Sequence, residues 1–319
     1  MKNRFTNNVS VTGYLFDLGK GFNALKKRTT GPQSKNPGTE YYRGDINVAT
    51  DDEGLNVVTL HFNYVTATKR DGSPNNVYSI LEKLVEEENT FENAGTNATM
   101  VRALGSVDVN DFVGRDGEMV SSKTINAGFI SDDVRRNPEM GATFDTDMLI
   151  AACTERETDD DTFVQVRGYV FSFRKEAIPV VFNIRTQAGM NYFLGLDASN
   201  SNPVFTEVKG DIISSTIERK IEEESAFGEP TVRTTTFSRR SWDISWAKPE
   251  PYEWDDESTL TKKEFKEMLS VREEKLAAEQ KRHEEYLASR EGKQGFPETK
   301  KATTSKKKVE EEEEDDFPF

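Results

Sequence analysis

The amino-acid sequence predicts a mainly β protein with two OB-fold-like barrels, followed by a charged helix and a disordered acidic tail. First, the octapeptide VSVTGYLF at residues 9–16 recurs as VQVRGYVF at residues 164–171, with five of eight residues identical. Second, the apolar pattern of the first third predicts three strands, a short helix and two strands, which is the element order of an OB fold. Third, the chain ends in a Lys-rich and then acidic segment that cannot bury enough apolar surface to fold.

The repeat extends beyond the octapeptide. Residues 47–50 and 54–56 align with residues 183–186 and 189–191, and Gly105 and Gly210 begin a similar later strand. Self-similarity of this kind indicates a duplicated domain. The expected parts are a first OB-like domain at 1–135, a second OB-like domain with linker at 136–255, a charged helix at 256–292 and a disordered tail at 293–319.

Composition limits the function. The 319 residues carry a net charge of −15, one cysteine and two histidines, so there is neither an internal disulfide nor a zinc ligand set. Thiol, triad and metal-hydrolase chemistry are disfavoured, and we expect no cofactor. The chain has no long apolar run and no signal-peptide core at its start. We expect no membrane partner and a cytoplasmic location in a bacterium or a phage-infected host.

Alternating apolar residues predict the strands of the first domain at 9–16, 46–48, 55–68, 100–113 and 119–130. A capping box that begins at Ser79 predicts a short helix to about Glu88. Tyr14 and Phe16 share the polar face of the first strand, where they could stack on bases. Alternatively, Gly13 bends the strand and turns one of these rings inward.

Residues 18–39 contain five cations and no acid, and their glycines and prolines predict a long mobile loop between the first two strands. Cations interleaved with aromatic rings suit single-stranded nucleic acid, because cations neutralise phosphates and rings stack on bases. The alternative is a solvated loop. The candidate binding residues in and near the loop are Tyr14, Phe16, Lys20, Phe22, Lys26, Lys27, Arg28, Lys35, Tyr41, Tyr42, Arg43, Lys69 and Arg70.

The second domain has a different charge pattern. Residues 135–161 are expected to include a linker, and the acids at 159–161 lack the spacing of a calcium loop, so we propose no metal there. Only residues 172–178 separate its expected first and second strands. Arg167 and Tyr169 are its candidate DNA contacts. We expect this domain to bind a strand more weakly or to pack against another subunit.

The helix and tail follow. A capping box at Thr261 predicts a helix over 262–290, whose sparse apolar positions, including Phe265, Met268 and Leu269, indicate one short docking stripe. Seven acids at 310–316 then precede Phe317-Pro318-Phe319. This terminus offers a carboxylate, two rings and a stiff proline, a set that fits an apolar pocket rimmed by cations.

The sequence Asp315-Asp316-Phe317-Pro318-Phe319 resembles the acidic tip of bacterial and phage single-stranded DNA-binding proteins. The resemblance implies OB folds that hold single-stranded DNA and a tip that recruits replication, recombination and repair proteins. Two β domains and a charged helix before the tail depart from the usual bacterial pattern and favour a phage or divergent member. The departures leave the oligomeric state open.

These observations together predict a non-catalytic single-stranded DNA-binding protein whose first domain is the principal binder. The leading alternative is a scaffold or interaction protein of a replication or virion assembly that does not bind DNA. An acidic DNA mimic is a third hypothesis. A nuclease is disfavoured because no acidic cluster lies on a recognisable metal-binding framework.

Overall fold

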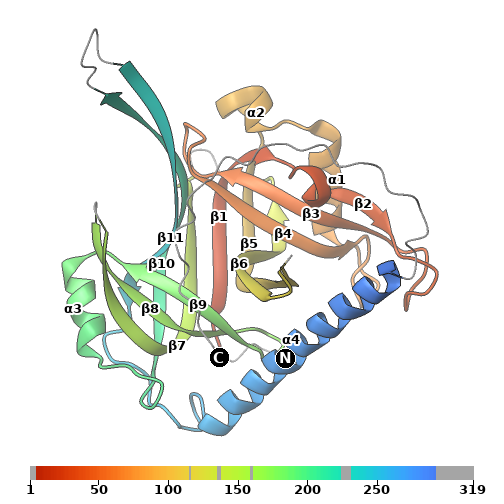
Figure 1. Cartoon of the computed structure of the whole chain (residues 1–319). Coiled ribbons are helices and arrows are strands. Elements are labelled where there is room, and N and C mark those ends of the chain that lie inside the picture. Colours follow the sequence, from red (N-terminus) through yellow and green to blue (C-terminus); the bar gives the residue numbers. More distant parts are fainter. Residues whose placement is uncertain (1–4, 115, 135–137, 159–160, 224–230, 292–319) are drawn as a thin grey trace. The chain divides into compact units, whose positions relative to one another are not determined.

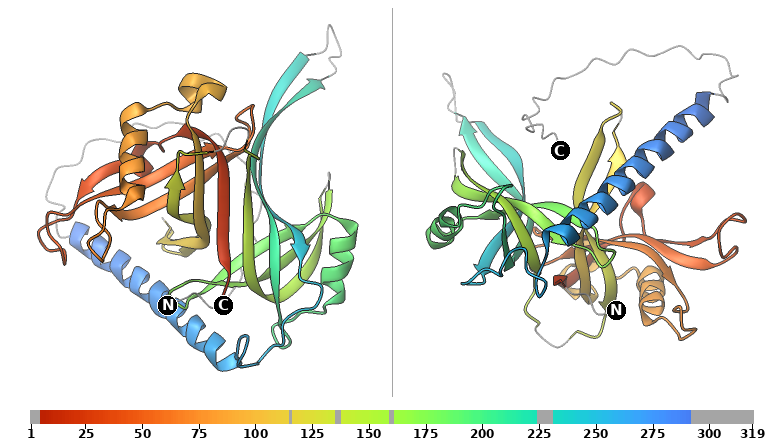
Figure 2. Two further views of the ribbon diagram at one scale, coloured as in Figure 1. Left: turned by 180° about the vertical axis from the view of Figure 1, so that it is seen from behind. Right: turned by 90° about the horizontal axis from the view of Figure 1, so that it is seen from below.

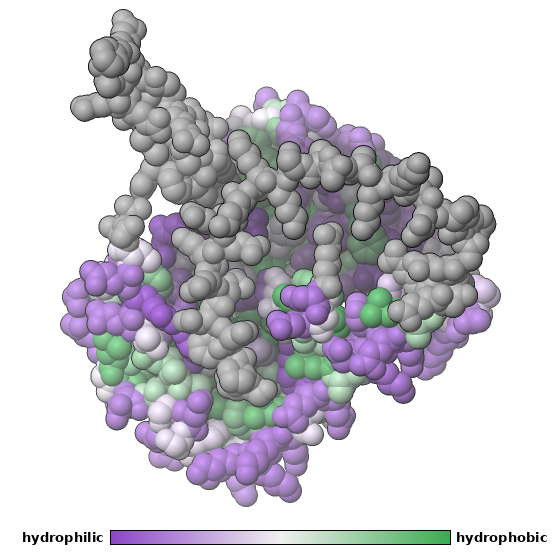
Figure 3. Space-filling model, in the orientation of Figure 1, coloured by the Kyte–Doolittle hydropathy of each residue, from purple (hydrophilic) through white to green (hydrophobic). Residues whose placement is uncertain are grey.

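The structure is a computed structural model that describes residues 5–114, 116–134, 138–158, 161–223 and 231–291 (Figure 1). The predicted disordered tail and its tip lie outside these residues. Within the described part, none of the helices is long and apolar enough to span a membrane. Hydrophilic side chains cover most of the described surface on the face shown in Figure 3, in keeping with a mean hydropathy of −0.72.

Five strands of the first part of the chain close into a barrel. The order is β1-β3-β4-β6-β5 and back to β1, with all neighbours antiparallel except β4 and β6. This five-stranded closure, with a helix between the third and fourth strands, is the OB topology. The elements are β1 (Asn7–Asp17), η1 (Gly21–Asn23), β2 (Lys26–Thr29), β3 (Glu40–Ala49), β4 (Val57–Thr66), α1 (Asn76–Glu87), α2 (Phe91–Ala94), η2 (Gly95–Asn97), β5 (Met100–Val113) and β6 (Met119–Ser131).

A second barrel has the same topology, which confirms the predicted fold class of two OB-fold-like barrels. Its strands close in the order β7-β8-β9-β11-β10, with β9 and β11 parallel and β10 returning to β7. Figure 2 shows α3 beside these strands. The elements are β7 (Gly141–Thr158), β8 (Asp161–Phe171), β9 (Ala177–Ile184), α3 (Gln187–Gly195), β10 (Val204–Glu223) and β11 (Thr231–Ala247).

The predicted repeat register is wrong by one strand. The octapeptide at 9–16 lies in β1, the first barrel strand, whereas its copy at 164–171 lies in β8, the second. Both copies carry a glycine where the first two strands of their barrel cross: a Cβ on Gly13 would lie 2.0 Å from the Ala49 carbonyl oxygen, and one on Gly168 2.1 Å from that of Leu149. The shared need for close backbone approach explains the likeness.

The later repeat positions behave differently. Residues 54–56 lie in the connection between β3 and β4, whereas residues 189–191 lie in α3, so their alignment is also wrong. Gly105 in β5 and Gly210 in β10 are true counterparts. β5 and β10 are the fourth strands of their barrels, and at each of these glycines the pairing with the fifth strand shifts register.

Three local predictions need correction. The expected mobile loop at 18–39 contains η1 and the strand β2, which pairs with β3. The helix α1 begins at Asn76, with Asn75 at its N-cap, so Ser79 lies inside the helix. The expected linker at 135–161 contains β7, and residues 172–176 therefore connect the second and third strands of the second barrel.

The two barrels share backbone pairing. Residues 7–12 of β1 pair antiparallel with residues 141–146 of β7. The buried Asn7 side chain hydrogen-bonds both the N–H and the C=O of Val107 and donates to the Phe171 carbonyl, at 2.8 to 3.2 Å. Buried polar groups that are satisfied in this way hold a single arrangement of the strands around them.

The helix α4 (Lys262–Glu291) docks through its first half. Thr261 accepts a hydrogen bond from the Glu264 N–H at 3.1 Å, as a capping residue does. Met268 is buried, and Phe265 and Leu269 pack with it against Phe5, Phe171 and Phe205, which confirms the predicted docking stripe.

One turn further along α4, Arg272 is only 5% exposed and contacts both barrels. Its guanidinium donates to Asp111 of β5 and to Glu176 of the turn between β8 and β9, the latter at 2.7 Å. Burial alone would raise the pKa of the Asp111 carboxyl, but hydrogen bonds from Arg272 and Ser121 outweigh it and hold that pKa below its ordinary value. Arg272 therefore links α4 to each barrel through ion pairs.

Candidate nucleic-acid interface

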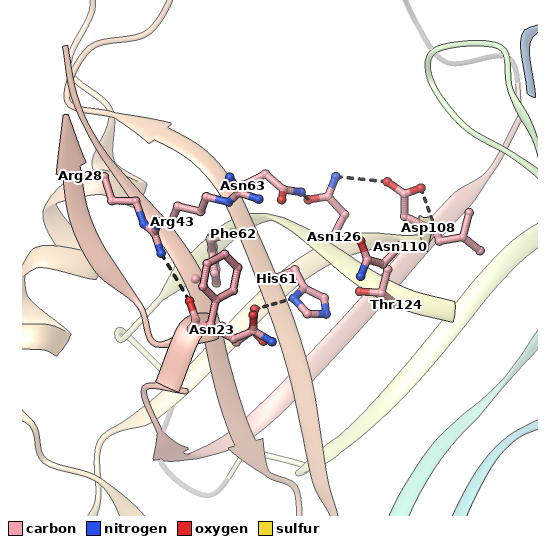
Figure 4. A pocket seen from close by; sticks show the side chains of 14 residues that line it. Asn23, Arg28, Arg43, His61, Phe62, Asn63, Asp108, Asn110, Thr124 and Asn126 are labelled. Carbon is pink, nitrogen blue, oxygen red and sulfur yellow. Dashed lines mark hydrogen bonds and ion pairs between the residues drawn. The ribbon is translucent and has the colours of Figure 1, made fainter. Parts of the chain in front are cut away.

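A cavity of about 220 Å³ lies on the outer face of the first barrel (Figure 4). Its walls come from η1, β2, β3, β4, β5 and β6. The lining residues are Phe22, Asn23, Arg28, Arg43, Gly44, Asp45, His61, Phe62, Asn63, Asp108, Val109, Asn110, Thr124 and Asn126.

The basic segment builds the rim of this cavity. Gly19 and Gly21 have positive φ, which allows the tight turn into η1 that presents Phe22 to solvent at 84% exposure. The guanidinium of Arg28 lies 5.9 Å from the Phe22 ring centre and donates to the Phe22 carbonyl at 3.4 Å. Arg43 pairs with Lys26 across the β2–β3 ladder, so cations from both strands gather here.

An aromatic pair lies further along the same hairpin. The rings of Tyr41 and Tyr64 are 4.6 Å apart, and Tyr64 is 52% exposed. Tyr41 is opposite Arg28 in the ladder, which places the ring pair next to the cationic rim. Exposed rings beside guanidinium groups form the stacking and charge-neutralising surface that single strands bind.

The interior wall is polar. His61 Nδ1 lies 2.5 Å from Asp45, which its strand pairing places opposite. Asn63 donates to Asn126 at 3.1 Å, and Asn126 donates to Asp108 at 3.5 Å. Burial raises the pKa of the Asp108 carboxyl, against an opposing hydrogen bond from the Val109 N–H.

Some of the predicted binding residues lie together at the cavity, and others form ion pairs or lie away from it. Phe22, Arg28 and Arg43 line the cavity, and Tyr41 borders it. Lys20 pairs with Glu92, and Lys27 pairs with Glu82, each at 2.6 Å. The remaining cations, all exposed, are Lys26 in β2, Lys35 in the β2–β3 turn and Lys69 and Arg70 in the turn after β4.

Of four further aromatic predictions, the one for Tyr42 is wrong, and the other three rings are partly exposed. Tyr42 is 3% exposed and packs on Tyr78 in the core, so its ring cannot meet a base. Tyr14 and Phe16 do lie on the outer face of β1, since burial alternates through Gly13 without reversal, and both rings contact Phe91 of α2 and stay partly exposed. Tyr169 packs on Phe265 of α4 and is half-buried.

In the second barrel, the polar side chains at the corresponding positions bond to one another. Arg167 donates to Gln165 within β8. Asn183 and Asp243 occupy the strand positions of His61 and Asn126, because each pair forms the parallel bridge that closes its barrel. Asn183 donates to Ser241, and Asp243 accepts from Arg185 and Arg239.

The sequence analysis did not identify the residues of the cavity's polar wall. His61 and Asn63 alternate with the buried Leu60 and Phe62 in β4, so strand alternation alone marks them as outward-facing neighbours. Asn110, Thr124 and Asn126 come from β5 and β6, which meet β4 only through barrel closure. Periodicity within one strand does not reveal that pairing.

The chain resembles known proteins both in sequence and in structure. Residues 7–282 match the sequence model of the YorF family. The sequence matches none of the curated proteins. A deletion variant of the single-stranded DNA binding protein from Thermus aquaticus is similar with a TM-score of 0.46 and 13% identity, over 80% of this chain and 98% of that chain. The wild-type Thermus aquaticus protein gives 0.43 and 12%, over 77% and 93%.

Proposed function

The chain belongs to the YorF family, and we propose that it is a non-catalytic protein that binds single-stranded DNA on the outer face of its first barrel. The observation that carries the proposal is the exposed Phe22 ring, held beside the guanidinium groups of Arg28 and Arg43 at the mouth of a polar cavity. The ring would stack on a base while the cations meet phosphates.

Local charge supports this proposal despite the net charge of −15. Residues 18–39 contain no acid. Arg43 is exposed, with no ion pair among the described residues. A local excess of positive charge attracts a phosphate backbone, whereas a negative total charge opposes non-specific binding to duplex DNA.

The proposal includes a role in replication, recombination and repair through the C-terminal tip. Asp315, Asp316, Phe317, Pro318 and Phe319 lie outside the described residues, so the sequence alone supports this part. We expect removal of Phe319 to reduce binding of a partner protein and to leave affinity for single strands unchanged. Partner binding that persists without Phe319 would contradict recruitment by the tip.

Fluorescence anisotropy with labelled single-stranded DNA, duplex DNA and RNA of one length tests the DNA-binding proposal. We expect the tightest binding to the single strand, weakening with salt. No binding to single strands at low salt would contradict the proposal and favour the scaffold alternative. Tighter binding to RNA would reassign the ligand.

A further inference from the structure

We propose that the cavity of the first barrel holds one base of the bound strand and selects bases with an exocyclic amino group over thymine or uracil. This inference rests on the proposed single-strand binding and specifies which bases the site prefers. Non-selective single-strand binding needs only ring faces and cations, because every base has a π-face. A walled polar cavity goes beyond that requirement.

The size of the cavity suits a single base. Its volume of about 220 Å³ is below the ~300–1,000 Å³ of sites for drug-sized ligands. The exposed Phe22 ring at its mouth gives a stacking surface, and a base that leaves the strand beside Phe22 enters between β4 and β6. The arginines then remain near the phosphates on either side.

The two ends of the cavity differ in chemistry. Figure 4 shows Arg28 and Arg43 at one end, on β2 and β3, and Asp108, Thr124 and Asn126 at the other, with His61 and Asn63 between them. Donors therefore concentrate at the rim. The far end is where the hydrogen-bonding edge of a base would lie.

Existing hydrogen bonds use one amide N–H each of Asn63 and Asn126 in the wall that leads to that far end. No hydrogen bond from the described residues reaches Asn63 Oδ1, so this oxygen is left as an acceptor. With its proton on Nδ1, toward Asp45, His61 has an acceptor at Nε2. The Asp108 carboxylate accepts from Asn126 and Val109 and retains further lone pairs.

Two further groups favour a polar occupant. Thr124 Oγ1 is buried and has no hydrogen-bond partner among the described residues. Burial raises the pKa of Asp108, which shows that its charged form is short of solvation and would gain from another donor. A ligand edge that donates hydrogen bonds satisfies both groups.

Exocyclic amino groups are the donors by which bases differ. Cytosine presents N4–H₂ and adenine N6–H₂, whereas thymine and uracil present O4, an acceptor, at the corresponding position. An acceptor facing Asn63 Oδ1 or Asp108 would be repelled. The cavity should therefore favour cytosine over uracil, two pyrimidines of nearly equal size.

The test compares oligo(dC) with oligo(dU) of equal length in anisotropy titrations with the full chain. One base-edge contact discriminates by at least about fivefold, so we expect oligo(dC) to bind at least that much tighter. Asn63→Ala and Asn126→Ala should bring the ratio toward one, by weakening the binding of oligo(dC) more than that of oligo(dU). Asn191→Ala, on the exposed side of α3, is the control and should keep the ratio.

Equal affinities, or tighter binding to oligo(dU), would overturn the base preference and leave single-strand binding intact. A preference that both variants retain would also overturn it, because the selecting groups would then lie elsewhere. Failure to bind either oligonucleotide would instead overturn the proposed function itself.

Discussion

The guanidinium of Arg28 lies 5.9 Å from the centre of the Phe22 ring, and the same residue donates to the Phe22 carbonyl. The Phe22 ring is 84% exposed. Here the arginine orients the ring at the mouth of the cavity, so stacking and charge neutralisation occur at one place.

Replacing Phe22 by alanine should weaken single-strand binding by ~1–3 kcal/mol, the contribution of one stacked base. The melting temperature should stay nearly constant, because the ring is 84% exposed. Anisotropy and thermal unfolding measure the two effects. Phe173, 68% exposed beside Arg174 in the second barrel, is a matched control, and an equal loss from Phe173→Ala would count against a specific role of Phe22.

The double variant Arg28→Gln and Arg43→Gln should flatten the salt dependence of binding. Each lost phosphate contact changes the slope of log K against log salt by ~0.7 for single strands. We therefore expect a change of about 1.4 across titrations from low to moderate salt. Lys263→Gln with Lys266→Gln in α4 is the charge-matched control, and an identical change there would point to bulk electrostatics.

Arg272→Ala should lower the free energy of unfolding by about 3 kcal/mol, because it leaves Asp111 and Glu176 buried, with Lys275 as their remaining ion-pair partner among the described residues. Urea unfolding measures this change. Lys266→Ala, exposed on the same helix, should cost far less. If both variants unfold at the same urea concentration, the linkage of α4 to the barrels by Arg272 does not contribute to stability.

Lys123 of β6 predicts a pH dependence. Its ammonium donates to the Val181 carbonyl at 2.8 Å and lies 4.6 Å from the Trp242 ring. Burial lowers the pKa of Lys123 to about 7, below the 10.5 of the unfolded chain. Above pH 7 the unfolded state therefore binds more protons than the folded state, so stability should rise with pH between about 7 and 10.

The mean slope from pH 7 to pH 9.5 should stay below the limiting ~1.4 kcal/mol per pH unit, because the ring faces favour the cation and so delay deprotonation of the folded state. Thermal unfolding at pH 7 and pH 9.5 measures the slope. Lys123→Met should remove it. A variant with the same pH dependence as the original chain would assign the slope to other groups.

Sequence patterns predicted much of this fold because local periodicity records burial. β5 at Met100–Val113 matches its prediction at both ends, and α4 begins at the predicted Lys262. The repeat register failed because Gly13 and Gly168 solve the same steric problem on different strands. A single-strand pattern does not distinguish these partners.

The candidate site was likewise predicted only in part. Phe22, Arg28 and Arg43 were found because they are close in sequence and chemically distinctive. Tyr42 and Phe16 were predicted to stack on bases, but packing against Tyr78 buries the ring of Tyr42, and Phe91 contacts that of Phe16. Asn126 needed barrel closure to reach Asn63.

Photocrosslinking tests the central claim, that the strand lies on the outer face of the first barrel, most directly. A single-stranded oligonucleotide with 5-iododeoxycytidine, irradiated in complex with the full chain, marks the aromatic rings next to its bases, and peptide mapping identifies them. We predict crosslinks at Phe22, Tyr41 or Tyr64. Crosslinks confined to the second barrel, for example at Phe173 or Trp246, would contradict the claim.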